Sequence, residues 1–529
     1  MRRLPNGSPA LITGLCLTLA VSLFISPGFA ALQTTPPNSP TTAWVTQDAA
    51  GHLHYRSTEK GDTIPDFSHA GYEGGGVSLP VVPTKKTVAP SDSGGDDTLA
   101  IQKALDAVAH LPLQDGFRGA VLLEPGTFHC AKTITLSQTG IVLRGSGSGE
   151  KGTVIAMTGE PHLCLQILGN EVRVPEIDST PGISITDVYV PAGAQRVTVS
   201  DASGLKVGDS IIIERKFTAK WIQSLGMDIL VRDGKPQTWI HPDKEMTYER
   251  TVRSVDGNKI GLDLPMPDAI DAQLMAPEVP KVFKVHPPAP RLAQCGIESL
   301  QITSPPPSGN LTTPNNHGID LNHCEDCWVK DVTMKDTTTN IHVLDGGRRL
   351  TIEGATAFHS TLPDDSKGAA GDFMIRGSQV LLDRCSATGT GAFFVATADT
   401  GAMLNVVLNC NFNGQGGIQP HMRWSTALLL DNCNLPDGKI ALHNRGFAGS
   451  GQGWAIAWAV AWNCSASLFK IGQPPGAFNW CIGCLGTPDK KLGINAGYSS
   501  FGIPVLPQSL YLAQLQERLG PGALKNIGY

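Results

Sequence analysis

The sequence predicts an all-β fold, a parallel β-helix, because one short phrase recurs four times. Each copy is an apolar run that ends in a polar residue and a cysteine, at residues 381–385, 406–410, 429–433 and 460–464. The cysteines are 25, 23 and 31 residues apart, and a period of roughly 20 to 50 residues is typical of solenoids. Each repeat is rich in β-forming residues and has no room for a helix, so each is interpreted as one coil. The four cysteines should therefore stack as an inward-facing ladder.

The composition supports a β-rich, turn-dense protein. Glycine is abundant, with 59 residues, and charged residues make up only 17% of the 529-residue chain. This balance argues against disorder. The length suits one long solenoid or several folding units.

Residues 1–30 are typical of an export signal. Arg2 and Arg3 precede an apolar stretch at 10–25, and residues 26–30 supply a break and small residues before a predicted cleavage after Ala30. The alternative is a retained membrane anchor, for which about 16 apolar residues is short. We therefore expect a secreted or periplasmic protein that has no membrane partner after signal cleavage.

The charge balance excludes some partners. The formal net charge is −6, and removal of residues 1–30 with their two arginines leaves −8. An acidic chain without a basic run is a poor nucleic-acid binder. An acidic glycan would need a local basic cleft, and the sequence does not indicate the oligomeric state.

The first part of the chain reads as an extended strap at 31–92, then a capping helix and the first coils at 93–165. Asp96 and Asp97 are suitable helix caps. They precede a predicted apolar face made of Leu99, Ile101, Ala104, Leu105 and Val108. Residues 120–123, 134–136 and 140–145 read as buried strands with glycine corners. A helix at this place would cover the open end of the solenoid.

Residues 166–285 interrupt the coil rhythm. Their short runs alternate polar and apolar residues, as antiparallel strands do, and predict a small inserted β-domain. The main β-helix is expected over 286–500. Residues 501–529 contain an amphipathic helix that ends at Gly520 and is expected to dock along the solenoid or cap its far end.

The start of the solenoid resembles a known family. Residues 97–106, 119–128 and 141–147 are similar to the opening of the pectate-lyase-like superfamily, whose members are right-handed parallel β-helices. The resemblance covers about 55 residues closely and implies that fold. It does not choose among the lyases, glycoside hydrolases, esterases and adhesins that share it. No stretch matches the calcium-binding carboxylate pattern of pectate lyases.

The cysteines leave three interpretations open. Eleven remain after signal cleavage, including the pairs Cys324/Cys327 and Cys481/Cys484. These could hold zinc, form disulfides, or occupy plain ladder positions in the core. No phosphate-binding loop, nucleophile elbow or metalloprotease motif is present, so no cofactor and no metal is expected.

The strongest candidate site is a repeated H-x-R phrase. His421 and Arg423 recur one coil later as His443 and Arg445, an offset of 22 residues. Residues two apart in a strand share a face, so like residues should stack. Unpaired stacked charges are too costly for a core. The set is therefore either a solvated or salt-bridged surface row, or an anion-binding catalytic cleft.

Such a cleft suits β-elimination on a uronic-acid glycan. Arginine clamps a carboxylate through two parallel hydrogen bonds and neutralises the charge that builds when the C5 proton leaves. His421 and His443 are the candidate proton-transfer groups, although arginine serves as base in some relatives. Four tryptophans could stack on sugar rings or be ordinary core residues: Trp221, Trp239, Trp424 and Trp454.

Two other functions stay open. A glycoside hydrolase needs two carboxyl groups about 5 to 9.5 Å apart, and Asp372, Asp383 and Asp431 are candidates, or else hold turns. The third possibility is a non-catalytic protein that binds polysaccharide.

Overall fold

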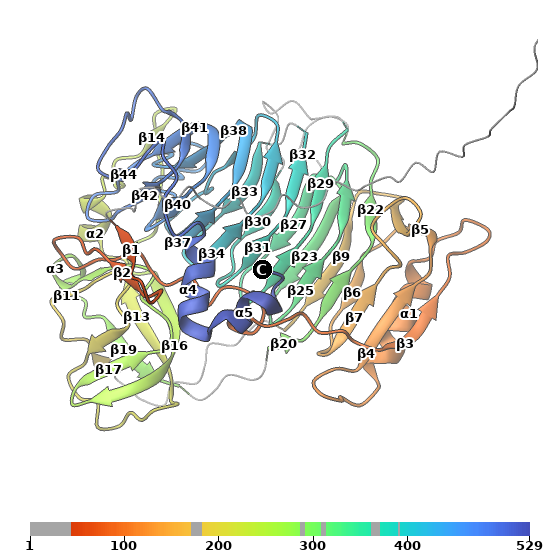
Figure 1. Cartoon of the computed structure of the whole chain (residues 1–529), viewed down its shortest axis with the longest axis horizontal. Coiled ribbons are helices and arrows are strands. Elements are labelled where there is room, and N and C mark those ends of the chain that lie inside the picture. Colours follow the sequence, from red (N-terminus) through yellow and green to blue (C-terminus); the bar gives the residue numbers. More distant parts are fainter. Residues whose placement is uncertain (1–43, 171–181, 286–290, 308–313, 361–370, 390–391) are drawn as a thin grey trace, which may run out of the picture. The chain divides into compact units, whose positions relative to one another are not determined.

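The computed structural model describes residues 44–170, 182–285, 291–307, 314–360, 371–389 and 392–529. The predicted signal and its cleavage after Ala30 lie outside these residues. The predicted right-handed parallel β-helix is confirmed, because strands of successive coils pair in parallel along two long sheets (Figure 1). Within the described ranges, no helix has the length and apolarity needed to cross a bilayer.

The first sheet takes one strand from each coil, and all its pairings are parallel. Its strands are β3 (Thr84–Val88), β4 (Gly119–Leu123), β7 (Ile141–Arg144), β21 (Gly296–Glu298), β25 (Trp328–Lys330), β28 (Thr351–Glu353), β31 (Leu381–Asp383), β34 (Met403–Leu408), β37 (Ser425–Asp431), β40 (Val460–Trp462), β42 (Trp480–Ile482) and β44 (Tyr498–Ser499), with β39 (Ile456–Ala457) beside β37. A short parallel pair, β20 (Leu292–Ala293) and β24 (Cys324–Glu325), lies apart from this sheet.

The second sheet contains two rows of strands, so a typical coil has three strands. The second row is β5 (Gly126–Cys130), β8 (Thr153–Met157), β22 (Gln301–Thr303), β26 (Thr333–Lys335), β29 (Thr356–Phe358), β32 (Ser386–Thr388), β35 (Asn411–Asn413), β38 (Asn434–Leu442), β41 (Ser465–Ile471) and β43 (Leu485–Pro488). The third row is β6 (Ile134–Leu136), β9 (Leu163–Leu168), β23 (His317–Asn322), β27 (Thr339–Val343), β30 (Gly371–Ile375), β33 (Phe393–Thr397) and β36 (Gly417–Ile418).

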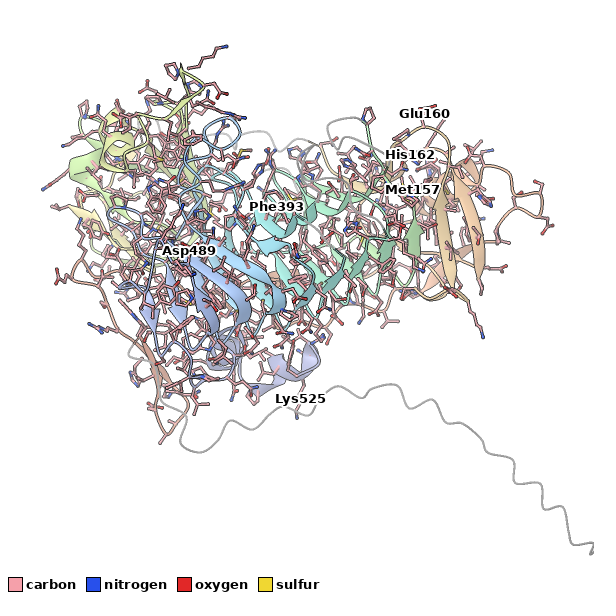
Figure 2. All side chains as sticks on the ribbon, turned by 90° about the horizontal axis from the view of Figure 1, so that it is seen from above. Met157, Glu160, His162, Phe393, Asp489 and Lys525 are labelled. Atoms are coloured by element: carbon pink, nitrogen blue, oxygen red, sulfur yellow. The ribbon has the colours of Figure 1, made fainter. Side chains whose placement is uncertain are left out.

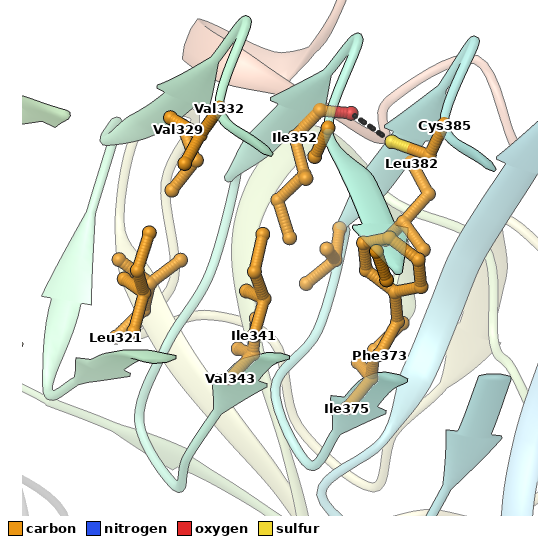
Figure 3. Close-up of a cluster of buried hydrophobic side chains, with 14 of the residues drawn as sticks. Leu321, Val329, Val332, Ile341, Val343, Ile352, Phe373, Ile375, Leu382 and Cys385 are labelled. Atoms are coloured by element: carbon orange, nitrogen blue, oxygen red, sulfur yellow. Dashed lines mark hydrogen bonds between the residues drawn. The ribbon is translucent and has the colours of Figure 1, made fainter. Parts of the chain in front are cut away.

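The coils enclose an apolar core that includes the predicted cysteine ladder. Figure 3 shows the part of this core around Cys385. The Cys385 thiol donates to the Ile352 carbonyl of the preceding coil at 3.3 Å, and Cys433 and Cys464 repeat this contact. Strand β37 pairs directly with β40, so no coil is skipped before Cys464. The ladder is confirmed. All the cysteines of the described ranges are free, buried thiols, so the disulfide interpretation is wrong.

Helix α1 (Thr98–Ala109) packs on the first coils, where Ile101, Leu105 and Val108 enter the solenoid core. Leu99 was expected on this face, but its side chain is 61% exposed. Asp97 precedes the helix, but its carboxylate accepts the N–H of His129 and makes no cap hydrogen bond with the helix. Asp96 accepts the Thr98 N–H at 3.0 Å instead. Each of the first strands lies within a residue or two of its predicted place.

Residues 182–285 form their own antiparallel sheet in the order β10 (Ile183–Ser184), β19 (Lys281–Lys284), β13 (Ser210–Lys216), β16 (Glu245–Asp256), β17 (Lys259–Leu262) and β12 (Arg196–Thr198). Smaller elements complete this insert: β11 (Tyr189–Val190), β18 (Ile270–Asp271), β14 (Val231–Arg232), β15 (Lys235–Pro236), α2 (Ala219–Ser224) and α3 (Ala272–Met275). The predicted boundary at residue 166 is wrong, because Gln166 and Ile167 still pair with neighbouring coils.

The point of insertion determines what the insert covers. It leaves the solenoid after the third-row strand β9 and returns before the first-sheet strand β21. It is thus an enlarged form of the turn that closes each later coil, and it lies in one compact unit with them. Residues 345–348, 376–379 and 399–404 are the corresponding segments of the later coils; the last of them includes the first two residues of β34.

The strap and the tail pack together on the first sheet. The strap contains a hairpin of β1 (Val45–Gln47) and β2 (Leu53–Tyr55) and a short helix η1 (Tyr72–Gly74). The tail contains α4 (Leu510–Leu519), capped by Ser509, and α5 (Pro521–Asn526). Gln514 of α4 accepts the N–H of Phe67 at 2.9 Å. The outer face of the late coils is therefore covered by other parts of the chain.

Candidate functional site

A cavity of about 560 Å³ lies between the insert and the stacked coil turns. Strand β16 and residues 239–241 line one side, and the turns at 345–348, 376–379 and 399–404 line the other, together with Arg423. Arg348, Ser378 and Met403 bridge from one coil to the next, so these turns are in register. A turn position that repeats in each coil thus supplies one wall of the cavity.

The walls carry more cations than carboxylates. Six cations line the cavity: Lys244, Arg250, Arg291, Arg348, Arg376 and Arg423. Four carboxylates face them: Glu245, Glu249, Asp345 and Asp399. Ion pairs join Arg291 to Glu249 at 2.6 Å, Arg348 to Glu249 at 2.7 Å and Arg376 to Asp399 at 2.8 Å. Within the described residues, Arg250 and Arg423 form no ion pair.

The walls also concentrate hydrogen-bond donors that have no acceptor. Four buried N–H groups among the cavity-lining residues lack a partner within the described structure: Nε1 of Trp239 and Nε of Arg250, Arg291 and Arg423. The fifth poorly satisfied donor, Nε of Arg348, faces Glu325 at 3.2 Å. Arg and Trp side chains can only donate. A buried donor without an acceptor costs about 1–3 kcal/mol. A ligand rich in anionic oxygen atoms would accept hydrogen bonds from these donors.

The structure brings three of the four predicted H-x-R residues together. Arg445 donates to the His421 carbonyl at 2.7 Å, and Gln452 contacts the His421 ring at 2.9 Å. Arg423 donates to Ser450 of the same loop at 3.0 Å and is the member that lines the cavity. The guanidinium of Arg445 also lies 5.4 Å from the ring centroid of Phe393. Figure 2 labels the position of Phe393. Ile418 pairs with Ile440, an offset of 22 residues, but both H-x-R phrases lie beyond the ends of β36 and β38, so the strand geometry predicted for them is wrong.

The environment of this cluster favours neutral histidine. Burial and the nearby charges of Arg445, Arg376 and Arg423 lower the pKa of His421 to about 4. Burial also lowers the pKa of Arg445 to about 10. His443 contacts the carbonyl of Asn444 at 2.7 Å, and burial lowers its pKa. His421 is therefore an unprotonated imidazole at neutral pH.

The sugar-stacking role predicted for the tryptophans is contradicted. Their exposed fractions are 6% for Trp221, 2% for Trp239, 2% for Trp424 and 9% for Trp454. Trp221 stacks on Trp239, and both meet Trp424 edge to ring, because the insert packs against the coils here. These rings form the interface between insert and solenoid and leave no face for a sugar.

The aspartates predicted for hydrolysis are also enclosed. Asp372 is fully buried and contacts His359 at 2.6 Å and Asn340 at 2.8 Å. Asp383 and Asp431 lie on the outer face of the first sheet, under the tail: Tyr529 donates to Asp383, and Ser509 donates to Asp431. Burial raises the pKa of both carboxyls to about 7. None of the three lines the cavity.

Sequence reasoning missed the carboxylates that do line it. Asp345 and Asp399 each follow a third-row strand by two residues, and those strands are two coils apart. A sequence pattern could have identified these two aspartates, because each begins a turn and has a glycine two residues later. The arginines of the opposite wall come from the insert and from Arg291, and no coil periodicity points to them.

No protein-family model matches the sequence, and no curated protein matches it. Among solved structures, the tailspike gp49 of Pseudomonas phage LKA1 is 15% identical, with 74% of this chain and 64% of that chain covered and a TM-score of 0.36. A tailspike mutant of Escherichia coli phage HK620, solved with a pentasaccharide, is 10% identical, with 86% and 59% covered and a TM-score of 0.39.

A polygalacturonase of Erwinia carotovora is 11% identical, with 82% of this chain and 96% of that chain covered and a TM-score of 0.33. The chain thus spans less than two thirds of the two tailspikes. Identities this low say nothing about shared chemistry.

Proposed function

We propose that this protein is an exported enzyme that cleaves an acidic polysaccharide by β-elimination at a uronic acid residue. The observation that carries the proposal is Arg423, a guanidinium without an ion pair in the described structure, on the wall of a donor-rich cavity. Its planar fork matches a sugar carboxylate. Neutralising that carboxylate stabilises the enolate-like charge that develops when C5 loses its proton.

His421 is the proposed base; it does not itself line the cavity, and it contacts Gln452 of the loop whose Ser450 binds Arg423. The Gln452 oxygen is buried without a partner, while its nitrogen faces Nε2 of His421. An amide turned by 180° fills the same space. In that orientation the oxygen accepts the Nε2–H, and Nδ1 keeps a free lone pair. Nδ1 takes the C5 proton, the electron pair forms the C4–C5 double bond, and the C4–O bond breaks. The departing oxygen takes a proton from solvent.

The test is Arg423→Ala with a panel of acidic and neutral glycans. Elimination is followed by the ultraviolet absorbance of the unsaturated product. We expect turnover to fall by roughly 100-fold or more, as when one transition-state donor is removed. Thermal unfolding should change little, since Arg423 forms no ion pair in the described structure.

Arg196→Ala, which removes an exposed arginine of β12, is the matched control and should keep full activity. An Arg423→Ala protein that unfolds readily but retains its specific activity would show the cluster to be structural.

A second candidate, hydrolysis, is favoured by Asp345 and Asp399. Two coil spacings place their backbones about 9.6 Å apart, close to the separation of carboxyls in inverting glycosidases. Burial raises the pKa of Asp399 despite Arg376 and Arg423 nearby, as befits a general acid. Hydrolysis yields new reducing ends without ultraviolet absorbance, whereas a non-catalytic binder yields neither signal.

A further inference from the structure

The insert carries a second buried arginine that the proposed reaction does not use. Arg250 on β16 is 5% exposed and lines the cavity together with Arg423. It also lines an adjoining cavity of about 310 Å³, which Arg423 does not reach. Arg250 therefore lies toward the end of the groove away from Arg423.

The hydrogen bonds of Arg250 leave its charge without a carboxylate. Its two terminal nitrogens donate to the carbonyls of Glu249 and Pro265, both at 2.8 Å, and Nε has no partner in the described structure. The guanidinium also lies 5.6 Å from the Tyr248 ring centroid. Asp263 shares the smaller cavity, but its Oδ1 accepts the Thr251 N–H and it forms no ion pair with Arg250 in the described residues.

The surrounding carboxylates are engaged by other arginines. Glu249 pairs with Arg291 and Arg348, and Glu325 contacts Arg291, Arg348 and Arg349. Burial lowers the pKa of Arg250 to about 10, because the nearby charges of Asp263 and Glu249 offset only part of the lost hydration. A buried cation with so little compensation is costly unless an anion joins it.

We propose that Arg250 forms a second anion subsite, so that the substrate is a polyanionic glycan with acidic groups on more than one sugar. This inference rests on the proposed function and names the substrate class of the same groove. One acidic group meets Arg423 on the coil turns, and another, further along the chain, meets Arg250, which shares both cavities with Arg348. The turn that holds Arg348 is three coils from Arg423, about 14 Å at the usual strand spacing. A single sugar cannot span that distance.

The experiment compares Arg250→Met with Arg423→Ala in direct binding of uronic acid oligomers. The probes are a hexamer of galacturonic acid, its monomer, and the hexamer with its carboxyls reduced to alcohols, with guluronic and glucuronic acid hexamers in parallel. We expect Arg250→Met to weaken hexamer binding on the order of tenfold. The salt dependence of binding should fall at the same time, and monomer binding should stay unchanged.

Arg250→Lys separates charge from structure. It loses the fork but keeps a cation, so it should recover part of the hexamer affinity if an anion binds here. Circular dichroism establishes that each variant is folded before binding is measured. Equal hexamer affinity of wild type and Arg250→Met overturns the inference, as does a wild-type protein that binds none of the charged hexamers.

The two proposals fail in different ways. Hexamer binding that depends on Arg250 without any cleavage would overturn the proposed reaction and leave the second subsite standing. Suppose instead that Arg423→Ala abolishes cleavage and Arg250→Met changes neither cleavage nor hexamer binding. That result would support the proposed reaction and overturn the second subsite.

Discussion

Asp268 is a buried residue of the insert that binds side chains of both the coils and the insert; we call it the Asp268 hub. Its carboxylate is 2% exposed and accepts the indole N–H of Trp424 at 2.8 Å and of Trp458 at 2.7 Å, which lie on successive coils. It also pairs with the buried Arg215 at 2.5 Å. Trp424 follows Arg423 directly, and both have positive φ, 64° and 59°. A left-handed pair without glycine needs such fixed partners.

Asp268→Asn should destabilise the protein strongly. The amide keeps the shape but removes the charge, so Arg215 becomes an uncompensated buried cation, and one indole meets a donor. Breaking a buried pair costs about 3–5 kcal/mol, which chemical denaturation can measure. Asp233→Asn is the control, because Asp233 is 88% exposed beside Arg232 and should change stability by less than about 0.5 kcal/mol. Equal stability of the two variants would contradict the hub.

At the scale of secondary-structure elements, the tail helix α4 is held on the first sheet by a buried carboxyl group. Helix α4 begins over the first sheet, where Asp431 of β37 accepts the Ser509 hydroxyl at 2.7 Å and the Tyr511 N–H at 2.8 Å. Ser509 in turn caps the helix through the Leu512 N–H. A fully buried carboxyl with no cation nearby favours its protonated form, and its pKa rises from 3.8 to about 7.

This shift predicts a pH dependence of stability. Between about pH 4 and pH 7 the native Asp431 holds a proton that the unfolded chain has released, so raising the pH lowers the free energy of unfolding. Asp431→Asn mimics the protonated form and removes this loss. Its stability relative to wild type should rise between about pH 5 and pH 8, on the order of a few kcal/mol.

Urea unfolding at both pH values measures the difference. The control is Asp437→Asn, at an exposed carboxylate of β38. Its stability relative to wild type should be the same at both pH values. A stability difference between wild type and Asp431→Asn that is constant across the range would show that Asp431 is ionised in the native protein.

What the sequence could predict follows from periodicity. The phrase ending at Cys410 repeats with the coils, so strands, core positions and the ladder were predictable from it. Asp383 and Asp431 hold equivalent places in the same phrase, and the sequence could not show that a distant tail covers both. The cavity could not be predicted from the sequence for the same reason. Arg250 belongs to an insert, and the position of that insert over the coil turns depends on tertiary packing.

At the scale of the whole molecule, the cysteine ladder runs along the solenoid core and continues past Cys464 to Cys484, whose thiol donates to the Ala461 carbonyl at 3.4 Å. Burial raises the pKa of Cys410, Cys433 and Cys484 well above the usual value. Thiols that stay protonated and enclosed are poor nucleophiles. The ladder therefore acts as packing within a continuous core.

The eleven described thiols should therefore not react with thiol reagents in the native protein. In a Cys16→Ser chain, a thiol-specific reagent should modify none of them before unfolding and all eleven afterwards. A reductant and a zinc chelator should each leave the unfolding temperature unchanged, since packing and not a crosslink or metal holds the coils. A lower unfolding temperature in reductant would reveal a disulfide, and one in chelator would reveal a bound metal. Fewer than eleven reactive thiols after unfolding would also count against the free ladder.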